Sequence, residues 1–214
     1  MRKNSKLIGR LFAAGLALVC IVSAADARAQ ACPTGVNPTA SSPLTPASAQ
    51  SNCTTRISNG FPIPDPTCTP GSINPTVTLA VLQNGDFRTG CERNTASSES
   101  DKNSTYAAYS IEHPTNNRGQ NQVCELDHLV SLEIGGADTL DNIWPQCGPS
   151  AVELNERYFK IKDGVENYLA AQVRAGAISL ADAQHGIATN WPQYIDAAHT
   201  FQASHGGQGN ANDQ

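Results

Sequence analysis

The chain has 214 residues, with 14 Lys or Arg and 19 Asp or Glu, which gives a formal net charge of −5 at pH 7. This acidic balance argues against a broadly basic surface of the kind that most nucleic-acid-binding proteins use to hold phosphates. Beyond residue 30, no apolar stretch approaches the ~20 residues that a helix needs to cross a bilayer. Composition therefore also argues against a transmembrane protein.

Residues 1–29 have the layout of a secretory signal peptide. Four basic residues precede an apolar run over residues 11–25, and Ala27-Arg28-Ala29 supplies the small residues of a cleavage site. We expect cleavage after Ala29 and a secreted or periplasmic mature protein. Cleavage removes five of the fourteen basic residues and one of the nineteen acidic residues, which leaves nine against eighteen and a net charge of −9.

Residues 30–67 are rich in Pro, Ser, Thr and Ala and show little hydrophobic periodicity. Such a composition predicts an extended or poorly ordered leader that adds little to a hydrophobic core. Residues 68–205 are enough for one domain with a small core. We expect the Gly- and Asn-rich residues 206–214 to be disordered.

Six cysteines follow the expected cleavage point, an even number in an exported chain, so we predict three disulfides. They are Cys32, Cys53, Cys68, Cys91, Cys124 and Cys147. Six cysteines allow fifteen pairings. Pairing of neighbours is the simplest of these: Cys32 with Cys53, Cys68 with Cys91, and Cys124 with Cys147. Zinc ligation is the less favoured alternative, because no C-x-x-C pair is present.

Residues 68–122 are mostly polar and predict little regular structure. The apolar residues 78–83 fit either a short helix or a short strand. The Asn116-Asn117-Arg118-Gly119 cluster predicts a turn or loop.

Residues 123–146 predict a strand, a loop and a second strand. The first part is rich in β-branched and leucine residues, and Gly135-Gly136 interrupts it. If the first strand continues to Ile134, its alternation places His128 on the apolar face, and Glu125 and Asp127 on the opposite face.

Helices are expected downstream. Ser150 and Glu153 have the spacing of a capping box, which predicts a helix over residues 151–175. A second capping pattern at Ser179 predicts a helix to about residue 189, and a third helix is expected between residues 190 and 201. The chain is therefore expected to be an α+β domain braced by disulfides.

Asp127-His128, Gly135-Gly136 and Asn142-Ile143 follow one another in the order found in the His-Me finger nucleases, the ββα-metal or HNH group. The chain resembles a small secreted bacterial branch of this group over roughly residues 68–201. The resemblance implies a ββα-metal motif with additional C-terminal helices. It also implies largely nonspecific hydrolysis of DNA, or of RNA, with a divalent metal ion, Mg²⁺ or Mn²⁺.

The resemblance assigns roles to three residues of the first strand. His128 is expected to be the general base that takes a proton from water. Asp127 is expected to bind the cation, and Glu125 to be a second ligand. The alternatives are a half-buried structural histidine, a surface carboxylate, and a charge that protects an edge strand.

Four further residues complete the expected site. Asn142 is expected to tie the loop to the backbone and so to orient His128. The resemblance implies one more His or Asn ligand on the following helix, and Asn155 is the candidate, because no histidine lies between residues 129 and 184. Arg157 and Lys160 are candidates for phosphate contacts, and Lys162 is a third positive charge on the same helix. The alternative for Asn155, Arg157 and Lys160 is an ordinary solvated helix surface.

The sequence thus predicts a secreted, metal-dependent endonuclease. Its rival is a noncatalytic secreted binding or structural module that keeps the finger as a scaffold, which the acidic charge favours. A Ca²⁺ site that only stabilises the fold is a third interpretation.

Overall fold

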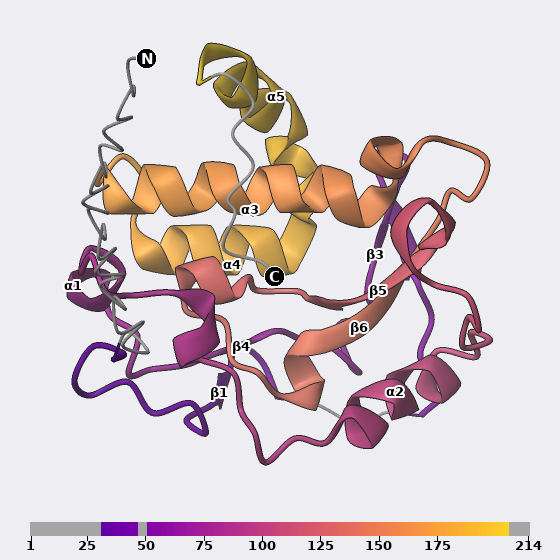
Figure 1. Ribbon diagram of the computed structural model, residues 1–214, viewed down its shortest axis with the longest axis horizontal. Helices are drawn as coiled ribbons and strands as arrows, with labels where there is room; N and C mark the ends of the chain where they lie inside the picture. Colours follow the sequence, from indigo (N-terminus) through magenta and orange to yellow (C-terminus); the bar gives the residue numbers. More distant parts are fainter. Residues whose placement is uncertain (1–30, 47–50, 206–214) are drawn as a thin grey trace, which may run out of the picture. The chain divides into compact units, whose positions relative to one another are not determined.

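The computed structural model describes residues 31–46 and 51–205. The expected signal peptide, residue 30 and the expected tail at 206–214 lie outside the described residues. The described part is an α+β fold, with helices and small sheets joined by long irregular segments (Figure 1). No helix in this part is both long and apolar enough to cross a membrane.

The strands of the described residues form three two-stranded antiparallel sheets. Strand β1 (Ser42–Pro43) pairs with β4 (Ser72–Ile73), and β2 (Arg56–Ser58) pairs with β3 (Phe61–Ile63). Strands β5 (Cys124–His128) and β6 (Ile143–Cys147) form the longest pair. Short sheets of this kind depend on packing against helices for their stability.

Helix α3 (Tyr158–Arg174) is central to the hydrophobic core, and α4 (Leu180–Asn190) and α5 (Ile195–Ser204) pack against it (Figure 1). Val165, Leu169 and Val173 recur at four-residue spacing, so they lie on one face of α3, and all three are fully buried. Each such side chain contributes about 1.5–3 kcal/mol of burial free energy. Trp144 and Trp191 are also fully buried.

Helix α3 begins later than its sequence predicts. Ser150 caps no helix, and residues 151–157 form turns that include a 3₁₀ segment at Leu154–Glu156. The Arg157 side chain instead donates to the carbonyls of Gln120 and Gln122. Long-range bonds made by this segment therefore take precedence over the local capping pattern.

The remaining helix predictions agree better with the structure. The Ser179 side chain caps α4 by accepting from the backbone N–H of Asp182, at 3.1 Å. A 3₁₀ turn at Trp191–Tyr194 leads into α5. Residues 78–83 contain the short helix α1 (Leu79–Leu82), which Thr78 caps.

The apolar pattern does not predict helix α2 (Glu99–Ala108), which lies in the polar stretch. Ser98 and Asp101 form a complete capping box at its start. Tyr106 and Tyr109 are the buried anchors of this segment. Capping and two aromatic anchors stabilise a helix whose apolar periodicity is too weak to be recognised.

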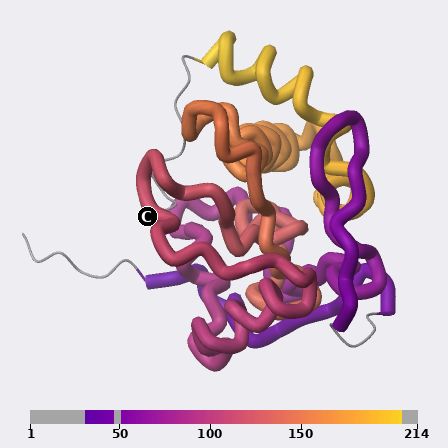
Figure 2. Tube along the Cα trace, turned by 90° about the vertical axis from the view of Figure 1, so that its right-hand side faces the viewer, coloured from indigo at the N-terminus to yellow at the C-terminus, as the bar shows by residue number. Residues whose placement is uncertain are grey.

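The prediction of an extended or poorly ordered leader that adds little to the core is wrong for residues 51–67. Residues 51–67 contain β2 and β3, and Ile63 belongs to the hydrophobic core. The indole Nε1 of Trp191 donates to Pro62 O at 2.9 Å, and Ser58 Oγ donates to Asn190 Oδ1 at 2.7 Å. Figure 2 shows this hairpin beside the C-terminal helices. Contacts with residues distant in sequence therefore hold this segment in a defined structure despite its composition.

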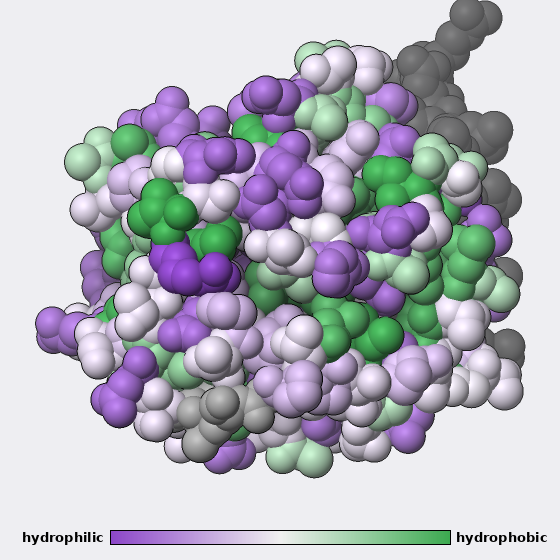
Figure 3. All heavy atoms as spheres, turned by 180° about the vertical axis from the view of Figure 1, so that it is seen from behind, coloured by the Kyte–Doolittle hydropathy of each residue, from purple (hydrophilic) through white to green (hydrophobic). Residues whose placement is uncertain are grey.

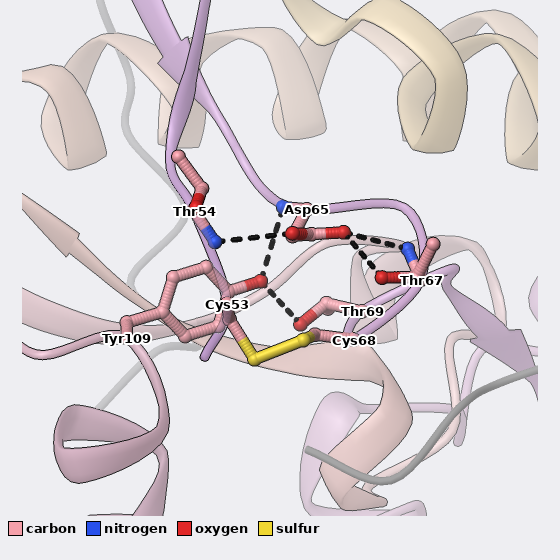
Figure 4. Close-up of a disulfide and its surroundings, with 7 residues drawn as sticks. All are labelled: Cys53, Thr54, Asp65, Thr67, Cys68, Thr69 and Tyr109. Atoms are coloured by element: carbon pink, nitrogen blue, oxygen red, sulfur yellow. Dashed lines mark hydrogen bonds between the residues drawn. A yellow bond between two sulfur atoms is a disulfide. The ribbon is translucent and has the colours of Figure 1, made fainter. Parts of the chain in front are cut away.

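Three disulfides are present, as predicted, but only Cys124–Cys147 has the predicted pairing. The other two join Cys32 to Cys91 and Cys53 to Cys68. Figure 4 shows the hydrogen bonds around Cys53–Cys68. The Tyr109 hydroxyl accepts from the N–H of Asp65 at 3.1 Å and lies 2.8 Å from Thr69 Oγ1. The predicted pairs Cys32–Cys53 and Cys68–Cys91 are therefore wrong, because the fold brings Cys32 to Cys91 and Cys53 to Cys68.

Few large hydrophobic side chains of the described residues are exposed. Among the described residues, the large hydrophobic side chains that are exposed are Ile57 and Leu79. The face in Figure 3 shows small separate hydrophobic areas among hydrophilic and neutral side chains. Scattered apolar side chains of this kind are ordinary for a folded domain.

Candidate functional site

The β5–β6 hairpin carries the residues of the sequence motif. Cys124 pairs with Cys147 at one end of the hairpin, and His128 pairs with Ile143 at the other. Strand β5 ends at His128, so the expectation of a strand that continues to Ile134 is wrong. Residues 129–137 form a loop with a 3₁₀ turn at Leu132–Ile134.

Asn142 holds this loop in place. Its Oδ1 accepts from the N–H of Val130, and its Nδ2 donates to the carbonyls of Val130 and Ala137, each at 2.9 Å. The backbone N–H of Leu129 donates to Asn142 O at 2.8 Å. Asn142 is fully buried, so it fixes the chain directly after His128. This is the geometry expected of a residue that orients His128 from a distance.

Gly136 is required where the loop turns back. A Cβ at this position would lie 1.9 Å from the carbonyl oxygen of Val130. No side chain fits there without a shift of the backbone. Gly135 has a φ of +76°, a left-handed conformation that also favours glycine.

His128 and Asp138 form a close pair at the end of the hairpin. Nε2 of His128 lies 2.8 Å from Oδ1 of Asp138. Asp138 also accepts from Lys102 Nζ at 2.8 and 2.9 Å and from the N–H of Asn94 at 2.8 Å. The carboxylate is therefore firmly positioned, and it holds the imidazole ring.

Electrostatics favour a neutral His128 and an ionised Asp138. Burial lowers the pKa of His128, and the hydrogen bond to Asp138 only partly opposes this effect. Burial raises the pKa of Asp138, but its bonds to His128 and Lys102 outweigh burial and hold that pKa well below its usual range. A neutral imidazole that donates from Nε2 to Asp138 has its lone pair on Nδ1. Within the described chain, no hydrogen bond engages Nδ1.

His128 lies at a polar pocket of about 320 Å³. Thr89, Gln122, Ser131 and Leu132 contribute to the lining, together with two basic side chains and five carboxyl groups. The basic ones are Arg93 and Lys160, and the carboxyl groups are those of Glu125, Asp127, Glu133, Asp163 and Glu166. The pocket is thus strongly acidic, which disfavours an anion unless a cation accompanies it.

Asp127 lines the pocket but is almost completely buried. Its Oδ2 accepts from the indole Nε1 of Trp144 at 2.9 Å. Lys162 Nζ lies 2.9 Å from Oδ2 and 3.1 Å from Oδ1. Both oxygens of the predicted metal ligand are therefore already engaged by donors from the protein.

Lys162 connects Asp127 to Glu166. Its side chain is fully buried, and Nζ donates to His128 O at 2.8 Å and to Oε1 of Glu166. Burial raises the pKa of Asp127 and of Glu166, and the ammonium group of Lys162 that they share only partly opposes this effect. Burial lowers the pKa of Lys162, but the two carboxyl groups more than offset this effect and raise it, so Lys162 stays charged.

Glu125 lies on the pocket side of the hairpin. Burial and the neighbouring Asp163 raise its pKa to about 7. Gln122 Nε2 donates to its Oε2 at 3.3 Å. A cation bound nearby would oppose this effect and favour the ionised form of Glu125.

The predicted residues after the hairpin are only partly brought to the pocket. Asn155 is exposed and does not line it. Arg157 is buried and donates to backbone carbonyls, so the prediction that it contacts phosphates is not supported. Lys160 lines the pocket and lies 2.7 Å from Asp163 Oδ2.

The predicted metal ligands do not form a site together. No group of three His, Cys, Asp or Glu side chains with metal-binding geometry occurs in residues 31–46 and 51–205. Glu125, Asp127 and Asn155 fail because Asn155 is outside the pocket and Asp127 is paired with Lys162. The remaining donors still have suitable chemistry, because Glu125 and Asp163 offer hard carboxylate oxygens within one acidic pocket.

Sequence reasoning assigned no role to Asp138, Asp163 or Glu166, and it counted Lys162 only among the positive charges of the helix. One signal was present: Lys162 falls in the apolar stripe of α3, three residues after Phe159 and three before Val165. A lysine in such a stripe requires a buried acidic partner. Nothing in the sequence marks Asp138, because its partner His128 is ten residues away across a loop.

Comparison with protein-family models, with curated protein sequences and with solved structures finds no match to this chain.

Proposed function

We propose that this protein is an exported nuclease that hydrolyses phosphodiester bonds of DNA or RNA through a ββα-metal finger. The finger consists of β5, β6 and α3, with His128 as the general base. The observation that carries the proposal is the His128–Asp138 pair, which directs one imidazole nitrogen to a carboxylate and leaves the other for substrate. The ordered motif in the sequence supports the same function.

The chemistry of His128 follows from its tautomer. Nδ1 accepts a proton from a water molecule, whose oxygen attacks the phosphorus. The bond from phosphorus to the leaving oxygen breaks, and a proton from solvent completes the alcohol. Asp138 stabilises the imidazolium that forms, while Asn142 keeps the backbone after His128 in place.

The acidic pocket is the main obstacle to binding a phosphodiester. A divalent cation held by Glu125 and Asp163 would supply positive charge for the phosphate and the leaving oxygen. Arg93 and Lys160 provide positive side chains at the same pocket. Three disulfides accord with an oxidising compartment outside the cytoplasm.

The test is direct. Purified mature protein should nick plasmid DNA or degrade RNA when Mg²⁺ or Mn²⁺ is present and stop when a chelator is added. His128→Ala protein should be inactive under the same conditions, whereas His113→Ala protein, changed at an exposed histidine away from the pocket, should be active. Intact plasmid and RNA with wild-type protein and every divalent metal would contradict the proposal.

A noncatalytic exported binding module is the second candidate. The five carboxyl groups of the pocket favour it, because they match a cationic ligand better than a phosphate. The same assays distinguish the two functions. A module of this kind would bind a cationic ligand at the pocket without cleaving any nucleic acid.

A further inference from the structure

The ammonium group of Lys162 lies among oxygen atoms from three different residues. Both carboxylate oxygens of Asp127 lie within 3.1 Å, His128 O lies at 2.8 Å, and Oε1 of Glu166 is in contact. Ser131 Oγ donates to the other oxygen of Glu166 at 3.0 Å. The set of two carboxylates and one carbonyl is the kind that a hard divalent cation takes in proteins.

A buried charge is costly unless its partners surround it. Lys162 is fully buried on the core side of α3, and its oxygen partners come from the end of β5 and from the next turn of α3. The ammonium therefore joins α3 to the residue that carries the imidazole. It also leaves no room for a second cation between Asp127 and Glu166.

We propose that Lys162 is a positioning residue that acts as a built-in cation: it occupies the place between Asp127 and Glu166, and it holds the His128 carbonyl. The positioning of His128 for catalysis rests on the proposed function. The exclusion of a divalent metal ion from Asp127 and Glu166 does not. A metal ion that binds the wild-type pocket would therefore use its remaining carboxyl groups, those of Glu125, Glu133 and Asp163.

The experiment is a calorimetric titration of full-length mature protein with Mn²⁺. Lys162→Met keeps a side chain of similar length and removes the charge. It should bind Mn²⁺ on the order of tenfold or more tightly than wild type, because two buried carboxylates then lack a cation. Adding Glu166→Gln to Lys162→Met should abolish this gain.

Arg174→Met is the matched control, since it removes a positive charge from the same helix at an exposed position outside the pocket. A gain in Mn²⁺ affinity that is equal in both variants would reflect general charge and would overturn the proposal. So would a Lys162→Met protein that binds Mn²⁺ no better than wild type.

A second measurement applies if Lys162→Met protein does not fold. Glu166→Gln in the wild-type background keeps Lys162 in place, so its Mn²⁺ affinity should equal that of wild type. A loss of about tenfold there would show that Glu166 binds metal beside Lys162 and would overturn the proposal. Mn²⁺ binding is measured without nucleic acid, so an inactive protein would count against the nuclease function and not against this inference.

Discussion

His128 Nε2 and Asp138 Oδ1 lie 2.8 Å apart, although ten residues and a glycine-containing loop separate them in the chain. The carboxylate is held in turn by Lys102 and by the backbone of Asn94. This relationship fixes the tautomer of the imidazole and leaves Nδ1 without a hydrogen-bond partner among the described residues. Variants of His128 and of Asp138 can therefore test the role of the base and the role of the carboxylate separately.

Replacement of His128 by Ala should reduce nuclease activity by ~10²- to 10⁴-fold, the usual contribution of a positioned general base. The midpoint of thermal unfolding should change little, because the side chain packs at the pocket and not in the main core. Cleavage rates and thermal melts of the same preparation test both statements. Folded His128→Ala protein that cuts plasmid at the wild-type rate would rule out this mechanism.

Asp138→Asn should lower activity by about 10- to 100-fold, the typical effect of losing a group that orients a site residue. The carboxylate raises the pKa of His128 against the effect of burial, so its loss should lower that pKa further. The rate rises with pH as the neutral imidazole forms, and this rise should therefore move to lower pH in the variant. Lys102→Met keeps the carboxylate and removes a positive charge that lowers the pKa of His128, so in this variant the rise should move to higher pH instead. An unchanged pH profile in Asp138→Asn would argue that Asp138 has no influence on the base.

Glu92 should make the protein less stable as pH rises. The side chain is fully buried, and neither oxygen has a hydrogen-bond partner among the described residues. Burial and the nearby Asp138 raise its pKa to about 9, from an ordinary value of 4.5. Between these values the folded state binds more protons than the unfolded state, so the free energy of unfolding falls as pH increases.

Glu92→Gln should remove this dependence and raise the free energy of unfolding at pH 8 by on the order of 1 kcal/mol or more. Urea denaturation of wild type and variant at pH 5 and pH 8 measures it. The change in stability from pH 5 to pH 8 is compared between the two proteins, so the contributions of other titrating groups cancel. If both proteins lose the same stability between pH 5 and pH 8, Glu92 is not the protonated group.

The disulfides offer a paired test of stability against function. Cys124–Cys147 closes 23 residues of sequence and Cys53–Cys68 closes 15, so loss of either should cost about 3 kcal/mol in the chain-entropy estimate. Only Cys124–Cys147 belongs to the hairpin that carries His128. Double Cys→Ser variants of each pair should therefore lose similar stability, while activity per folded molecule falls only for the 124/147 pair. Equal activity losses in the two variants would show that the hairpin disulfide has no special role.

Much of the local structure could be predicted from the sequence. The capping pattern at Ser179 and the strand–loop–strand order around Gly135-Gly136 both agree with the structure. The presence of three disulfides and the Cys124–Cys147 pairing also agree. These features depend on hydrogen bonds and apolar spacing among residues close in the chain, which the order of residues states directly.

Only the tertiary structure decided which charges meet. Lys162 contacts Asp127, which is 35 residues away in the chain, and Lys102 contacts Asp138, which is 36 residues away. Arg157 donates to backbone carbonyls 35 and 37 residues earlier. The tertiary structure also decided the conformation of the leader, because Trp191 and Asn190 bind it although they lie more than a hundred residues away in the chain. The sequence by itself determined that Asp127 and His128 are adjacent in the chain. It could not determine their partners, because a charged side chain can pair with any opposite charge that the fold brings near it.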